Sequence, residues 1–437
     1  SLELQAGRSI DINANITVEG SFTAIANEES ARGSFRDGGD ATFNSNGFTI
    51  NTADSSGSSH NISISYEDGP NGNDATGAMV IGTLNAGTDG TITINPGSGE
   101  TVSVDAVTNA NVLNLTNSNG AIFEGAVTAT TINLTDTTNN ADIVFQGNVT
   151  ATTFNTATQG YDLSLTGGGN TFTNAVTFQN TGTLNLGDAS GDTFTFNGGV
   201  TESTTGNVTL ASLIRTSNDL ISFGAVTLGS NVVIDSQATD GAGDISIGAV
   251  TGGNNTLKLT TENNIAGADI TASGAIAGVT TLTLADVGGT ATFSNNVATT
   301  DLTVGNTVAN VRFNGSTNTF TNAVNFQNDG TLIFGDATGD SFTFNGGLNT
   351  ASVAGTVTLN TSISSSNDAM VFGAITLGNN VTLDTNASST TGDLTLGVVT
   401  GGSNTLTLST GNNVANSDIT ASGNISGVTT LTLADVG

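Results

Sequence analysis

The stretch GAVTLGSNVVIDSQATDGAGDISIGAV, residues 224–250, contains three short pieces in which at least every second residue is apolar, at 226–228, 232–234 and 245–247. Such a pattern turns one face of a strand toward a core and the other toward water. The Gly, Asn, Asp and Ser residues between the pieces are those that turns favour. The Ala-Val pair at 225–226 occurs again at 249–250, so the stretch contains one complete repeat of the pattern.

This period recurs along the chain at spacings of about 21 to 27 residues, each with about three alternating pieces. Strands this short do not form stable hairpins by themselves. Three of them per period predict one coil of a parallel β-helix, because stacked coils pair every strand edge except those at the two ends. The fold expected is therefore all-β, a parallel β-helix (solenoid) of about 18 coils of about 20–27 residues.

A larger duplication is superimposed on the short period. NTFTNAV occupies 170–176 and again 318–324, and the segment at 278–288 is repeated at 427–437. We therefore expect one continuous β-helix over 1–437, with irregular coils and longer loops at 1–83, regular coils at 84–139, and large repeats at 140–288 and 289–437.

The composition excludes several classes of protein. The 437 residues include 58 Gly, only 2 Pro and no Cys, and 37 acidic residues outnumber 6 basic ones, for a net charge of −31. Without Cys there are no disulfides or thiolate metal sites. The negative charge argues against nucleic acid or anionic lipid as a partner. No apolar run approaches the roughly 18 residues of a membrane helix, so we expect no membrane insertion by this segment.

The opening segment, SLELQAGRSIDINANITVEGSFTAIAN, carries a pattern of apolar and small residues at Leu2, Leu4, Ala6, Gly7, Ile10, Ile12 and Ile16. This pattern resembles the repeats of filamentous-haemagglutinin-type bacterial adhesins. GNTFTNAVTF and GTLNLGD look like strand repeats of autotransporter passengers. The resemblance implies a right-handed β-helix, export to the bacterial cell surface and an adhesive or structural role. Because Ser1 opens directly into a strand pattern, we expect a segment of a longer exported protein.

Acidic loops are the candidate metal sites. Calcium prefers several carboxylate and carbonyl oxygens on a flexible turn, whereas the same residue types also form turns that need no metal. Both interpretations stay open at this point, with calcium as the one possible cofactor. The candidate ligands are Asp188 and Asp192 in GDASGD, Asp336 and Asp340 in GDATGD, and Asp68 and Asp74 in the segment 67–74.

No catalytic residue is proposed from the sequence, and we expect no enzyme. Polysaccharide-degrading β-helix enzymes form one alternative, but the basic candidates Arg215, Lys258 and Arg312 are scattered, and Tyr66 and Tyr161 are the only Tyr residues available to stack on sugars. Ice binding by threonine arrays is another, although uneven coil lengths would break such an array unless the variation is confined to one corner.

The function expected is that of an extracellular β-helix rod that mediates attachment or forms a filament or stalk. Its partners would be glycans or other components of host or neighbouring cell surfaces. The main alternative is a self-assembling sheath or S-layer-like component. In that case copies would associate end to end or laterally, since open coil ends expose strand edges.

Overall fold

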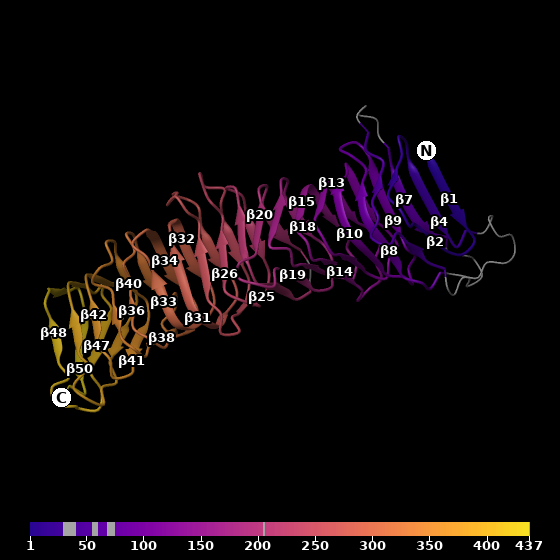
Figure 1. Cartoon of the computed structure of the whole chain (residues 1–437). Coiled ribbons are helices and arrows are strands. Elements are labelled where there is room, and N and C mark those ends of the chain that lie inside the picture. Colours follow the sequence, from indigo (N-terminus) through magenta and orange to yellow (C-terminus); the bar gives the residue numbers. More distant parts are fainter. Residues whose placement is uncertain (29–40, 55–59, 68–74, 204–205, 437) are drawn as a thin grey trace. The chain divides into compact units, whose positions relative to one another are not determined.

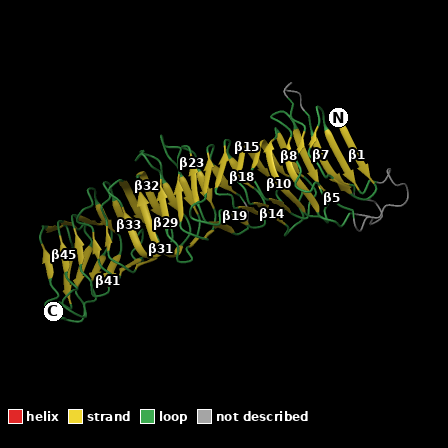
Figure 2. Cartoon of the chain, in the orientation of Figure 1, coloured by secondary structure: helices red, strands yellow, loops and turns green. Residues whose placement is uncertain are grey.

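A computed structural model describes residues 1–28, 41–54, 60–67, 75–203 and 206–436. Within these residues every regular element is a β-strand, and the paired strands run parallel (Figure 2). Stacked coils form a β-solenoid of about 18 turns, which confirms the fold class predicted from the sequence. The chain divides into two compact units, unit 1 at 1–212 and unit 2 at 213–437.

The strands of unit 1 are short, and the longest have eight residues. In chain order they are β1 (Leu2–Ala6), β2 (Ile10–Asp11), β3 (Ile16–Thr17), β4 (Phe22–Ala26), β5 (Phe43–Asn44), β6 (Ile50–Asn51), β7 (Ile62–Tyr66), β8 (Met79–Asn85), β9 (Thr91–Asn95), β10 (Val102–Asn109), β11 (Val112–Leu115), β12 (Ala121–Phe123), β13 (Val127–Leu134), β14 (Asp142–Phe145), β15 (Val149–Thr156), β16 (Asp162–Leu165), β17 (Gly169–Phe172), β18 (Val176–Phe178), β19 (Leu184–Leu186), β20 (Thr193–Phe196), β21 (Val200–Glu202) and β22 (Val208–Leu210).

Unit 2 contains the remaining strands of the described residues. They are β23 (Leu213–Thr216), β24 (Ile221–Phe223), β25 (Val226–Leu228), β26 (Val232–Asp235), β27 (Ile245–Ile247), β28 (Val250–Thr251), β29 (Leu257–Thr260), β30 (Ile270–Ala272), β31 (Ile276–Ala285), β32 (Val287–Phe293), β33 (Val297–Val304), β34 (Val308–Phe313), β35 (Thr317–Phe320), β36 (Val324–Asn325), β37 (Leu332–Phe334), β38 (Ser341–Phe344), β39 (Leu348–Asn349), β40 (Val357–Leu359), β41 (Ser362–Ser365), β42 (Met370–Phe372), β43 (Ile375–Leu377), β44 (Val381–Asp384), β45 (Leu394–Leu396), β46 (Val399–Thr400), β47 (Thr405–Ser409), β48 (Ile419–Ala421), β49 (Ile425–Ser426) and β50 (Thr430–Ala434).

Each strand pairs with the equivalent strand of the next coil. In unit 2 one face of the solenoid is the series β23, β26, β29, β31, β33, and a second is β24, β27, β30, β32, β34. Figure 1 shows neighbouring members such as β31 and β33 side by side. Coil lengths vary: Ile375 pairs with Val357, whereas Ile62 pairs with Phe22 across a much longer connection. The loops absorb most of this variation, and three of the described strand pairs contain a register shift, at Val107/Asn109, Ala277/Val279 and Val287/Thr290.

Alternating burial builds the interior. In β20 both Phe residues are buried and both Thr residues are partly exposed, as the two-residue period of a strand requires. Phenyl rings of successive coils stack: Phe123 on Phe145 at 4.5 Å in unit 1, and Phe293 on Phe313 at 5.0 Å in unit 2. The interior is therefore an apolar ladder, and dispersion between stacked rings adds to the free energy gained from burial.

Glycine permits close approach where coils turn. A Cβ built on Gly147 would overlap the backbone of Gly125 in the coil before, and one on Gly167 would overlap the backbone of Gly147 in turn. Any larger residue in this row would force the coils apart. This gives a physical reason for much of the high glycine content at the corners.

Candidate functional sites

The two GD-x-x-GD loops are closed by their second aspartate. Oδ2 of Asp192 accepts hydrogen bonds from the backbone N–H of Asp188, at 2.8 Å, and of Ala189, at 3.0 Å. Asp340 makes the equivalent bonds to its own loop. Both carboxylates are buried, with 8% of each residue exposed. Each therefore stabilises its own turn, a role that requires no metal.

The calcium prediction for these loops stays a prediction. In each loop the carboxylate of the second aspartate accepts a hydrogen bond from the backbone N–H of the first: Asp192 from Asp188, and Asp340 from Asp336. Within the described residues, no three His, Cys, Asp or Glu side chains come together as a set that could hold a metal ion. Asp68 and Asp74 lie outside the described residues.

The two tyrosines are core residues and cannot stack on a sugar. Tyr66 is 3% exposed and Tyr161 is fully buried. The Tyr66 hydroxyl accepts a hydrogen bond from the Phe43 N–H at 2.9 Å and donates to the Ala78 carbonyl at 3.1 Å. The Tyr161 hydroxyl accepts from the Ala157 N–H at 3.2 Å. Their hydroxyl groups thus satisfy backbone groups inside the solenoid.

The burial of these tyrosines has a measurable consequence at high pH. Burial raises the pKa of Tyr66 and of Tyr161 to about 12, although the hydrogen bonds from Phe43 and Ala157 oppose the rise. Since the unfolded pKa is about 10, the protonated hydroxyls stabilise the fold fully below about pH 10, and this stabilisation is lost as the pH rises toward about 12. We expect the ultraviolet absorbance of tyrosinate to stay low in the native protein up to about pH 11. A native titration midpoint near the unfolded value would contradict this assignment.

An ion pair links two coils on the surface of unit 2. Arg215 on β23 stands in register with Asp235 on β26, and its Nη2 and Nε lie 3.1 and 3.2 Å from Asp235 Oδ2. The Asp235 side chain is only 2% exposed, whereas that of Arg215 is 36% exposed. Burial raises the pKa of the Asp235 carboxyl, and nearby Glu262 adds to the rise, while the Gln237 N–H and Arg215 oppose it. The guanidinium thus covers a carboxylate that is otherwise shielded from water.

The second large repeat lacks this arginine. Ser364 on β41 occupies the position that corresponds to Arg215, and Asp384 on β44 corresponds to Asp235. A surface hollow of about 420 Å³ lies there, lined by Ser and Thr residues, by Asp384 and Asn386, and by Phe342 and Ile363. The sequence contains the Arg-to-Ser difference but gives no indication of the hollow, because the neighbours of Ser364 become known only once the two coils are in register.

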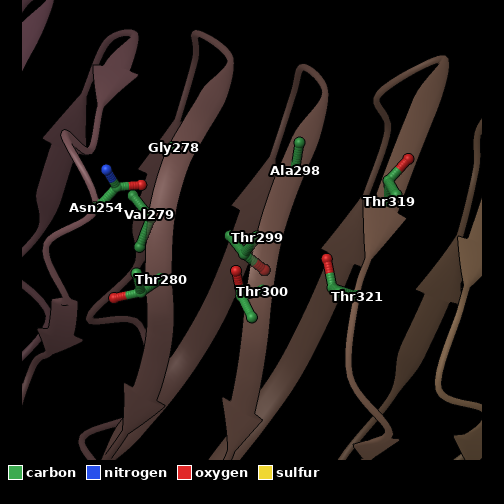
Figure 3. A pocket seen from close by; sticks show the side chains of 9 residues that line it. All are labelled: Asn254, Gly278, Val279, Thr280, Ala298, Thr299, Thr300, Thr319 and Thr321. Atoms are coloured by element: carbon green, nitrogen blue, oxygen red, sulfur yellow. The ribbon is translucent and has the colours of Figure 1, made fainter.

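A further hollow, of about 220 Å³, lies on unit 2 where β31 and β33 bend (Figure 3). The labelled residues are mostly threonines, with Thr299 and Thr300 on β33 and Thr321 just after β35. No charged side chain lines it. A similar hollow of about 190 Å³ in unit 1 is lined by Thr128, Thr150 and their neighbours. Neither hollow contains an acid–base pair of the kind that hydrolysis requires.

The uneven coil lengths do not break the threonine rows. Thr128 on β13 pairs with Thr150 on β15, and Thr150 pairs with Thr171 on β17. All three are exposed. This row is therefore in register, but the hollow across it leaves the surface indented where an ice-binding array would be flat.

Asparagine has a role that sequence reasoning missed. Side-chain Oδ1 atoms at corners accept backbone N–H groups of the following coil: Asn148 from Gly169 at 2.9 Å, and Asn296 from Thr317 at 2.9 Å. Asn318 is buried, and its amide joins the Val297 N–H to the Gly315 carbonyl. A turn-forming residue indicates only local structure in a sequence, so these contacts between coils could not be inferred from it.

Comparisons with protein-family models, curated proteins and solved structures return no match. No helix that could span a membrane occurs in the part of the chain that the structure describes. The sites above are therefore interpreted from their own geometry.

Proposed function

We propose that this chain is an extracellular structural and adhesive β-helix rod, part of a larger exported bacterial surface protein that mediates attachment or forms a stalk or filament. The observation that carries the proposal is the construction of the solenoid. Coils stack through parallel, in-register strands over an apolar ladder, while the outer positions are dominated by uncharged Thr, Asn and Ser. Such a stack is stabilised by contacts between neighbouring coils and can be extended by repetition.

The resemblance of the opening segment to filamentous-haemagglutinin-type adhesins supports an external location. The composition agrees with it, because 6 Lys and Arg residues in 437 offer few cleavage sites to trypsin-like proteases. Stability from coil stacking also needs no disulfide, and the chain has no Cys. A net charge of −31 favours solubility and opposes lateral association of copies at low salt.

Two of the three basic candidates for a polysaccharide-degrading site are engaged elsewhere, and the third, Lys258, lies on β29. Arg215 pairs with Asp235, and Arg312 donates from Nε to the Asn314 side chain at 2.7 Å. With the tyrosines buried, we favour a structural role over catalysis. Ice binding is a second candidate, favoured by the in-register Thr128, Thr150 and Thr171. The indentation of that surface places it below the structural role, and a thermal-hysteresis measurement separates the two.

Labelling of cells tests the proposal. Antibodies against the purified chain should label intact cells of the source organism as strongly as permeabilised ones, and external protease should remove the label. Label that appears only after permeabilisation would overturn the extracellular assignment. Negative-stain microscopy of the purified chain then separates the alternatives: isolated elongated particles favour a stalk, and ordered polymers favour a self-assembling sheath.

A further inference from the structure

The internal duplication provides two versions of one surface site within unit 2. In the first version Arg215 and Asp235 lie in register on β23 and β26. In the second, Ser364 and Asp384 lie in register on β41 and β44. At the offset of 149 residues β23 corresponds to β41 and β26 to β44, so the two versions occupy equivalent places in their coils.

The carboxylates of the two versions have the same backbone partner. Oδ1 of Asp235 accepts the N–H of Gln237 at 3.0 Å, and Oδ1 of Asp384 accepts the N–H of Asn386 at 2.9 Å. These bonds hold both carboxylates in the same orientation. In the first version the other oxygen, Oδ2, receives the guanidinium of Arg215. Among the described residues, no side chain forms an ion pair with Asp384.

In the second version smaller or more polar side chains replace those of the first: Ser364 stands at the position of Arg215, and Ser362 and Thr382 stand at the positions of Leu213 and Val233. The hollow of about 420 Å³ is lined by the polar residues Ser341, Ser362, Ser364, Thr382, Asp384 and Asn386 and by the apolar residues Phe342 and Ile363, on which the methylene groups of an arginine side chain can pack. Hydroxyl oxygens and a carboxylate oxygen are acceptors for the five N–H groups of a guanidinium. No Lys or Arg lines the hollow. Its shape and chemistry therefore complement an arginine side chain.

We propose that the hollow at Asp384 binds an arginine side chain presented by a basic partner polypeptide. Arginine fits better than lysine because its planar fork donates several hydrogen bonds in fixed directions, and because the first version of the site is filled by arginine. The partner is a different protein: a second copy of this chain would bring a further charge of −31, whereas a basic polypeptide is attracted over long range. This inference does not depend on the extracellular role, so arginine binding can be disproved while the extracellular role still holds.

The test is a titration of the full, isotope-labelled chain with the peptide acetyl-Gly-Arg-Gly-amide, followed by amide chemical shifts. We expect shifts at Ser364, Asp384 and Asn386. The peptide in which citrulline replaces Arg should cause none, because citrulline has no charge. A third peptide carries Lys in place of Arg. The assignment to arginine would be overturned if the citrulline peptide caused the same shifts as the Arg peptide, if the Lys peptide bound equally well, or if calcium chloride caused equivalent shifts.

Four variants sharpen the result. Asp384→Asn keeps the Oδ1 acceptor and should weaken binding about fivefold or more. Ser364→Arg should fill the hollow and abolish binding, and Arg215→Ser should open a second site with new shifts at Asp235. Asp393→Asn is the control of matched charge: its Oδ1 accepts the Asp418 N–H at 2.9 Å, an acceptor that Asn retains, and binding should be unchanged. Unchanged binding by both Asp384→Asn and Ser364→Arg would overturn the proposal, and Ser364→Arg decides alone if Asp384→Asn does not fold.

Discussion

Replacement of Phe313 by Ala is expected to lower the free energy of unfolding by about 3–5 kcal/mol. The side chain is fully buried on β34. Its ring lies 5.0 Å from that of Phe293 in the coil before and 6.1 Å from that of Phe334 in the coil after. Ala would leave a cavity between two coils whose spacing is fixed by backbone pairing, so the site cannot collapse around it. Urea unfolding followed by circular dichroism measures the loss.

The internal duplication supplies the matched control. Leu165, also fully buried, occupies the position that corresponds to Phe313 in the first large repeat. Phe313→Leu therefore introduces a residue that the same coil geometry already accepts, and it should cost less than about 1.5 kcal/mol. If Ala and Leu at this position cost the same, the ring would not be filling the interior as described.

Replacement of Asn318 by Ala is the second large expected effect, a loss of about 2–6 kcal/mol in the free energy of unfolding. Asn318 is fully buried at the start of a coil. Its Oδ1 accepts the Val297 N–H at 2.9 Å, and its Nδ2 donates to the Gly315 carbonyl at 2.7 Å. Ala leaves one buried donor and one buried acceptor without partners, each at about 1–3 kcal/mol. Thermal and urea unfolding both report this loss.

Asn325 provides the comparison for that experiment. It lies on β36 in the same unit and is exposed, so Asn325→Ala should change stability by no more than about 0.5 kcal/mol. The first large repeat has Asn170 at the position of Asn318, bound to the Val149 N–H and the Gly167 carbonyl. Asn170→Ala should therefore reproduce the loss. A small effect at both buried positions would contradict a bridging role for the amide.

The strands could be predicted because they depend on local alternation. Val226–Leu228 and Ile245–Ile247 are strands as the alternation indicates, and the repetition of the period identifies the stacking. Coil length could be predicted less well, since strand register persists across connections as long as that from Phe22 to Ile62. A loop changes length at little energetic cost when the strands on either side remain paired.

The surface chemistry could not be predicted in the same way. The sequence indicates turn residues or calcium ligands for the aspartates of GDASGD, and the structure adds that Asp192 is buried against its own loop. The opening at Asp384 depends on the absence of an arginine one coil away, at Ser364. Ser364 and Asp384 lie 20 positions apart in the sequence and become neighbours only through the stacking of coils, so no local pattern encodes their pairing.

Disulfide formation between introduced cysteines tests the stacked, in-register solenoid most directly, because the native chain has no Cys. Thr128 and Thr150 are exposed, paired neighbours on β13 and β15, whereas Thr171 lies one coil further. Paired residues on adjacent strands are separated by about 4.8 Å, which a disulfide can bridge. Residues two strands apart are separated by about 9.6 Å, which is too far for a disulfide. We expect rapid intramolecular oxidation of Thr128→Cys/Thr150→Cys and none of Thr128→Cys/Thr171→Cys. Failure of the first pair, or equal oxidation of both, would contradict the account.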